Sequence, residues 1–185
     1  EAMLLKRFSH PGIVRGLESA FQGDDPALGL SAADRAALAA LSGGGAPSYL
    51  YARSRAEVAS ALRLAADRKL RPVLLDPRCG AEAVLEAAAA AGLPPASLSV
   101  VLVLDLGDPL FHLRSAGALS RAGVAVGFGG GGVRRSAALA VRHGMDPGAA
   151  RGALLGKGFP GVGRPLSVGS PADLVLLDGD PVEPA

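Results

Sequence analysis

Aspartate residues follow two of the apolar segments that have the length of buried strands. Asp76 comes directly after the run 72–75, and Asp105 and Asp108 follow the run 100–104. The carboxyl ends of parallel strands are where barrel enzymes place their active sites, so these side chains are candidates for a binding site. Carboxylates bind divalent cations, but aspartates at such positions also cap turns through hydrogen bonds to the backbone. Both interpretations remain open at this point.

The other side chains that could act in catalysis are scattered. His10, His112 and His143 lie far apart in the sequence, and none directly follows a predicted strand. His143 ends a predicted helix, where it would interact favourably with the helix dipole. Cys79 begins a predicted helix, a position that favours a thiolate, but no histidine is near it in sequence and we predict an ordinary thiol. A single cysteine excludes an internal disulfide and a multi-cysteine zinc site.

A glycine-rich segment suggests a different chemistry. Residues 127–132 fit the pattern G-x-G-x-x-G between a predicted strand and a predicted helix, with Arg134 and Arg135 just beyond. Backbone amides in such a loop can hold a phosphate at a helix N-terminus. A dinucleotide fold would place a second strand with an acidic end about 20 residues later, but the next apolar strand spans 174–177. Nucleotide or anion binding at this loop is therefore an alternative hypothesis.

These residues are carried by an alternation of strands and helices. Ser54, with Glu57 three residues later, is typical of a capped helix start. We predict strands at 49–52, 72–75, 100–104 and 124–128, and helices at 54–68, 81–91, 111–122, 136–143 and 146–155. Four strands that are each followed by a helix indicate parallel βα units. They fit an open doubly wound sheet or half of a barrel, and the periodicity does not decide between the two.

The predicted units divide the chain into three parts. Residues 1–47 form an N-terminal helical segment, 48–155 hold the four βα units, and 156–185 form a loop and a C-terminal strand. The 185 residues are enough for one domain with a core, yet fewer than the roughly 250 of a complete (β/α)8 barrel. Apolar residues make up 49% of the chain and aromatic residues 4%, so Ala, Leu and Val must build the core.

Composition also limits the classes of partner. With 19 basic and 17 acidic residues, the net charge is only +2. No basic stripe interleaved with aromatic residues is present, which argues against nucleic-acid binding. No apolar run reaches the ~20 residues of a membrane span. The N-terminus lacks the regions of a signal peptide, and the lone cysteine fits a reducing compartment, so we expect a cytoplasmic protein. The chain does not begin with Met and is expected to be a piece of something longer.

The segment 169–181, Gly-Ser-Pro-Ala-Asp-Leu-Val-Leu-Leu-Asp-Gly-Asp-Pro, is a short apolar strand between two turns. It resembles the closing strand of the amidohydrolase superfamily, the imidazolonepropionase-like metal-dependent hydrolases. The resemblance extends back to about Ser48. It implies an α/β fold consisting of the C-terminal half of a (β/α)8 TIM-like barrel, with a C-terminal strand from the accessory β-sandwich.

The same resemblance implies zinc or another divalent metal, but the expected ligands are missing. No His-x-His pair occurs in the chain. Tyr51 stands where the family has a histidine after the fifth strand, the sixth-strand end at Asp76 has none, and Gly131 stands where the family has an aspartate. We therefore expect no metal or other cofactor and leave catalytic residues unassigned. The candidate pocket residues at strand ends are Tyr51, Arg53, Asp76, Asp105, Asp108, Gly130 and Gly131.

The leading hypothesis is an amidohydrolase-like domain that has lost metal-dependent catalysis and serves as a structural or ligand-binding subunit. An alternative is the C-terminal part of an active hydrolase of non-peptide C–N bonds, whose metal ligands come from a missing N-terminal half. Half a barrel leaves two unpaired sheet edges, which are costly in isolation. We therefore expect a partner chain, whether a second copy or the missing half.

Overall fold

The structure is a computed structural model that describes residues 46–156 and 179–182. The predicted N-terminal helical segment and the predicted strand at 174–177 lie outside the described residues, as does nearly all of the loop before that strand. The predicted four βα units fall within the described part.

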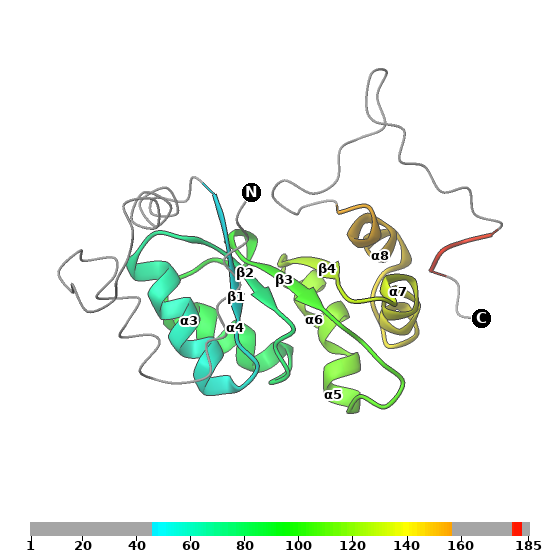
Figure 1. Ribbon diagram of the computed structural model, residues 1–185, viewed down its shortest axis with the longest axis horizontal. Coiled ribbons are helices and arrows are strands. Elements are labelled where there is room, and N and C mark those ends of the chain that lie inside the picture. The colour runs from blue at the N-terminus through cyan, green and yellow to red at the C-terminus, as the bar shows by residue number, and fades with distance from the viewer. Residues whose placement is uncertain (1–45, 157–178, 183–185) are drawn as a thin grey trace, which may run out of the picture.

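The described chain alternates strands and helices throughout (Figure 1). Each strand is followed by at least one helix, as the sequence predicts. The elements are β1 (Pro47–Tyr51), α3 (Arg55–Asp67), β2 (Arg71–Leu75), α4 (Ala81–Ala90), η2 (Pro95–Ser97), β3 (Ser99–Leu102), α5 (Leu110–Leu113), α6 (Ser115–Arg121), β4 (Ala125–Phe128), α7 (Val133–Arg142) and α8 (Pro147–Leu154).

The strands form one parallel sheet in which neighbours in space are also neighbours in sequence. Among the described residues the sheet has four strands in the order β1-β2-β3-β4, and every pair is parallel. This confirms an α/β fold with a parallel sheet. In a doubly wound sheet the strand order reverses at the first strand, so that strands that are not consecutive in sequence lie side by side.

The two faces of the sheet differ in what covers them. Side chains alternate between faces along a strand, and the even-numbered strand residues belong to the same buried cluster as the helices. These residues are Leu50, Leu74, Val100, Leu102 and Val126. The opposite side, which we call the inner face, carries Tyr49, Tyr51, Val73, Leu75, Ser99, Val101, Ala125 and Gly127. Val73 and Ser99 are buried, whereas Tyr49 on the edge strand β1 is 37% exposed.

Local signals explain how the elements begin. Ser54 accepts a hydrogen bond from the Glu57 N–H while the Glu57 carboxylate accepts from the Ser54 N–H, so α3 starts with a complete capping box. Hydrogen bonds from the backbone of Ser54 and Arg53 lower the pKa of Glu57. At the other end of the fold, Asp146 caps α8 through the Ala149 N–H, with Pro147 at the first helical position.

Several element boundaries differ from the predicted ones. Strand β1 begins at Pro47, two residues before the predicted start, and β3 ends at Leu102, two residues before the predicted end. The helix predicted at 111–122 is divided into α5 and α6 around Arg114, which ends one helix and precedes the other. The helix predicted from 136 begins at Val133, directly after the glycine run. Because glycine is a poor helix former, helix propensity does not indicate that a helix begins directly after the glycine run.

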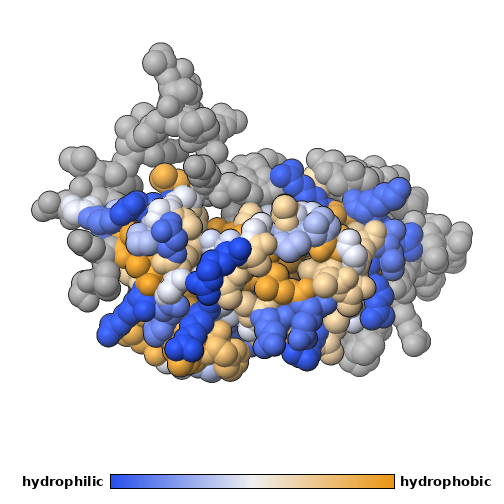
Figure 2. Space-filling view, turned by 180° about the vertical axis from the view of Figure 1, so that it is seen from behind, coloured by the Kyte–Doolittle hydropathy of each residue, from blue (hydrophilic) through white to orange (hydrophobic). Residues whose placement is uncertain are grey.

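Apolar side chains remain exposed at several points of the surface. The most exposed are Leu155, Leu106, Phe111 and Leu110. From the side opposite to Figure 1, apolar patches lie in the middle of the molecule and are bordered by hydrophilic side chains (Figure 2). None of the helices in the described part of the chain has the length and apolar character needed to cross a bilayer.

Candidate functional site

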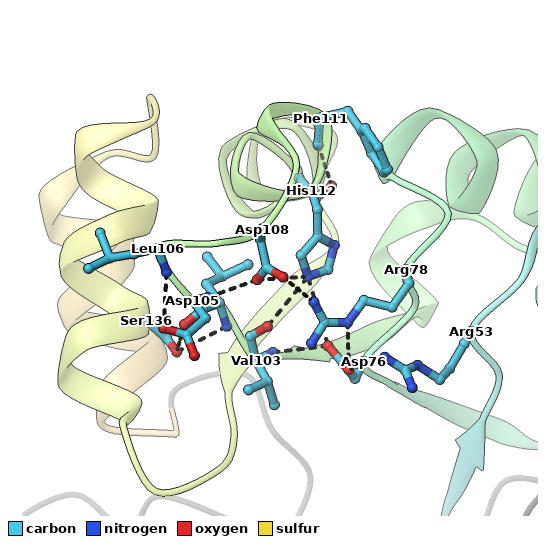
Figure 3. Close-up of polar contacts among 12 residues, drawn as sticks. Arg53, Asp76, Arg78, Val103, Asp105, Leu106, Asp108, Phe111, His112 and Ser136 are labelled. Carbon is cyan, nitrogen blue, oxygen red and sulfur yellow. Dashed lines mark hydrogen bonds and ion pairs between the residues drawn. The ribbon is translucent and has the colours of Figure 1, made fainter.

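Charged side chains from two neighbouring strands meet where those strands end. Asp76 follows β2 directly, and the segment 103–112 after β3 brings Asp108 and His112 to the same place (Figure 3). Arg78, two residues beyond Asp76, lies between the two aspartates. We call these four residues, Asp76, Arg78, Asp108 and His112, the strand-end cluster. The predicted candidates Asp76 and Asp108 thus come together, joined by two residues that the sequence analysis did not select.

The guanidinium of Arg78 binds both carboxylates. Its Nε donates to Asp76 Oδ2 at 2.8 Å and its Nη1 to Asp108 Oδ1 at 2.5 Å. The side chains of Asp76 and Asp108 are only 16% and 13% exposed, and that of Arg78 is 28% exposed. Burial disfavours the charge on Arg78, but the hydrogen bonds and negative charges of the two aspartates outweigh it and raise the pKa of Arg78. The cluster therefore contains its own permanent cation.

The backbone of Asp76 holds β2 and β3 together beyond their regular pairing. Its N–H donates to Val101 O at 2.8 Å, and its Oδ1 accepts from the Val103 N–H at 3.3 Å. Asp76 has φ of +48°, a left-handed conformation that aspartate tolerates better than most residues. Asp76 therefore joins two segments through backbone hydrogen bonds and is also an ion-pair partner of Arg78.

His112 is almost fully buried beside the ion pairs. It is 1% exposed, and its Nε2 lies 3.4 Å from Val103 O, 3.8 Å from Asp76 Oδ1 and 3.9 Å from Asp108 Oδ2. Burial, together with the positive charge of Arg78, lowers the pKa of His112 despite the neighbouring carboxylates. Its Nδ1 has no hydrogen-bond partner within the described structure. The sequence feature that could have identified His112 is its position four residues after Asp108, at the start of a helix, which places the two side chains near each other.

Asp105 belongs to the turn after β3 and lies toward the solvent. Asp108 Oδ2 accepts from the Asp105 N–H at 2.8 Å, which closes the turn. The Asp105 side chain is 67% exposed and pairs loosely with Arg135 at 3.7 Å. Nearby, the Ser136 hydroxyl of α7 bonds both the N–H and the carbonyl of Leu104, each at 3.1 Å. These contacts tie the β3 loop to α7 but leave Asp105 outside the strand-end cluster.

The remaining candidates lie around the cluster and only Arg53 contacts it. Arg53 Nη2 is 3.8 Å from Asp76 Oδ2, and its side chain is half exposed. Tyr51 ends β1 beside Leu75 and makes no polar contact with the strand-end cluster within the described structure. Gly130 packs against Val103 with φ of +78°, and Gly131 faces open space. Burial raises the pKa of Cys79, opposite to the activation considered at a helix start.

The cluster does not fit the divalent metal that the resemblance implies. Across residues 46–156 and 179–182, no group of three or more His, Cys, Asp and Glu side chains has an arrangement that could hold a metal ion. The two buried aspartates direct their oxygens to Arg78 and to backbone N–H groups. A cation would have to displace the Arg78 guanidinium to reach them.

Comparison with known proteins adds no assignment. No protein-family model, no curated protein and no solved structure matches the chain. Any function must therefore be argued from the site and the fold.

The buried His112 makes a pH dependence of stability predictable. Since the folded-state pKa lies below the usual value of 6.5, the unfolded chain binds a proton at His112 before the folded chain does. Stability is therefore unaffected above that pH and falls as the pH drops below it. We expect chemical denaturation to show this loss in the wild type and a smaller loss in His112→Leu.

The comparison between the two proteins isolates His112, because Asp76, Asp108 and Arg78 face it in both. Contributions from the aspartates at lower pH cancel to first order in the difference. An equal pH dependence in both proteins would contradict the assignment of a neutral buried imidazole.

Proposed function

We propose that this chain is a non-catalytic, amidohydrolase-like half-barrel subunit whose role is to complete a barrel with another polypeptide. The observation that carries the proposal is the placement of Arg78 between Asp76 and Asp108. In a barrel enzyme the strand ends hold the reacting groups. Here both carboxylates at that location bind the guanidinium of one arginine in the same chain.

The other groups near the strand ends also lack the features of catalysts. His112 is buried and its lowered pKa favours the neutral form. A general base must reach the proton that it removes, and His112 is 1% exposed. Cys79 carries a thiol with a raised pKa, whereas nucleophilic cysteines have lowered ones. These properties support a structural role for the strand-end cluster.

The sheet itself supports the need for a partner. Within the described chain, β1 and β4 each pair on one side only. Unpaired sheet edges expose backbone groups that form hydrogen bonds with another strand. A parallel sheet is ordinarily covered on both faces. The helix cluster covers one face, and on the inner face Val73 and Ser99 are buried while Tyr49, on the edge strand β1, stays 37% exposed.

Metal content tests this proposal directly. We expect the chain, purified without chelators, to contain zinc, iron and manganese far below one equivalent by elemental mass spectrometry. Adding an excess of Zn²⁺, Mn²⁺ or Fe²⁺ should leave the melting temperature unchanged, since a ligand that binds only the folded state would raise it. Stoichiometric metal would refute the non-catalytic subunit and favour the C-terminal part of an active hydrolase.

A further inference from the structure

From the two edges and the inner face we infer that the partner is a second copy of this chain, with β4 of each copy beside β1 of the other in a closed eight-stranded barrel. This inference rests on the proposed function and specifies its partner. It follows from three features of the described residues: the strand order, the sizes of side chains on the inner face, and a groove along β4.

Strand order makes the two edges compatible with each other. All four strands run parallel in the order β1 to β4. A half-turn rotation about an axis along the strands therefore sets β4 of one copy beside β1 of the other, again in parallel. The same rotation satisfies the second junction, so the assembly closes at two copies. Eight strands give a barrel interior that side chains can fill.

The outer edge of β4 directs backbone groups away from β3, toward a side on which no other described strand lies. The N–H groups of Ala125 and Gly129 donate to Leu98 O and Leu102 O of the β3 segment. Because alternate residues of a parallel strand bond to the same neighbour, Val126 and Phe128 direct theirs to the other side. No described strand lies on that side.

Side-chain size on the inner face falls from one edge of the sheet to the other. Strand β1 carries Tyr49 and Tyr51, and β4 carries Ala125 and Gly127 in the corresponding rows. Tyr49 is 37% exposed and Tyr51 is partly exposed, although both are large and largely apolar. At each junction of the two-copy barrel, the tyrosines of one copy face the small residues of the other. Interiors of this kind are filled by pairing large with small side chains.

A groove along β4 provides the space for the incoming strand. It has a volume of about 490 Å³ and lies between β4 and α8. Small or flexible residues form much of its lining, including Ala125, Val126, Met145, Ala149, Gly152 and Ala153. Since α8 contacts β4 and lines this groove, we expect it to pack against a strand that occupies the position next to β4.

The closed assembly would also complete the strand ends. Tyr51 ends β1 and Arg53 lies two residues beyond it, and the glycine loop 129–132 follows β4 directly. Placing β1 beside β4 of the other copy brings Arg53 of one chain next to the glycine loop of its partner. The opening at the carboxyl ends of the strands is then lined by residues from both copies.

Disulfide trapping tests the junction. In a Cys79→Ala background, we would combine Ala125→Cys with Tyr49→Cys in one variant and with Tyr51→Cys in another, to allow for either register. Within one chain β2 and β3 lie between β1 and β4. The three spacings of about 4.8 Å place β1 and β4 about 14 Å apart. A disulfide requires Cβ atoms about 4 Å apart. Any bond between the two positions must therefore join two copies.

We expect mild oxidation at micromolar concentration to convert at least one variant to a covalent species of twice the chain mass, and to nothing larger. Tyr49→Cys combined with Arg63→Cys, on the exposed side of α3, is the matched control and should remain uncrosslinked. Light scattering of the unmodified chain should also give twice the chain mass, which keeps the test valid if a cysteine variant fails to fold.

Two results would overturn the inference. A monomer without crosslinks would mean that another part of this chain, or a different polypeptide, covers the edges. A ladder of higher oligomers would mean open head-to-tail association without closure. In both cases the proposed non-catalytic role stands as long as the metal content is negligible, whereas stoichiometric metal refutes that role whatever the chain mass.

Discussion

Replacing Arg78 with leucine should lower the free energy of unfolding by about 2 kcal/mol. The substitution leaves Asp76 and Asp108, both mostly buried, without the cation that pairs with both of them. Removing one partner of a fully buried pair costs roughly 3–5 kcal/mol, and the effect is smaller here because Arg78 is 28% exposed. Urea denaturation followed by circular dichroism measures the change.

A matched arginine on the surface provides the control. Arg55 pairs with Glu86 at 3.2 Å, with side chains 67% and 57% exposed. Arg55→Leu should therefore change stability by less than about 1 kcal/mol. Adding Asp76→Asn and Asp108→Asn to Arg78→Leu should recover at least half of the loss, because asparagine still accepts the backbone hydrogen bonds without a charge. Equal effects of Arg78→Leu and Arg55→Leu would show that the cluster is not an energetically coupled unit.

Gly117→Ala should destabilise the fold by about 2 kcal/mol, although alanine is the better helix former. A Cβ at this position of α6 would lie 2.7 Å from the carbonyl oxygen of Gly144 and 3.0 Å from the nitrogen of Met145. Both atoms are backbone, so the loop between α7 and α8 would have to move. Thermal denaturation should show the loss as a decrease of several degrees in the melting temperature.

Gly107→Ala is the matched control for this prediction. A Cβ at Gly107 meets no atom within 4 Å, and its backbone is not in the left-handed region. We expect a change within about 0.5 kcal/mol. If Gly117→Ala were as neutral as Gly107→Ala, the close packing of α6 against that loop would be wrong.

The sequence predicted the features that depend on neighbouring residues. The capping box at Ser54 and the apolar strand runs are local signals, and the structure has them where expected. The same local reasoning placed Asp76 and Asp108 at strand ends. It did not predict strand order, because periodicity reports which face of a strand is buried and carries no information on which strands are adjacent.

The centre of the candidate site escaped prediction for a related reason. Arg78 and Asp108 are 30 positions apart, and they meet only because β2 and β3 are neighbours. His112 was not selected from the sequence because it does not directly follow a predicted strand. The turn after β3 and the short helix α5 return it to Val103 and to both aspartates. Contacts of this kind follow from the fold and not from spacing.

The consecutive strand order has a consequence for how the chain acquires its structure. Paired residues such as Tyr49 and Val73, or Ser99 and Ala125, lie only about 25 positions apart. Short separations between contacting residues lower the entropy lost in closing each loop and speed folding. Each strand can therefore dock as soon as one further βα unit has emerged from the ribosome, so the sheet can grow vectorially during synthesis.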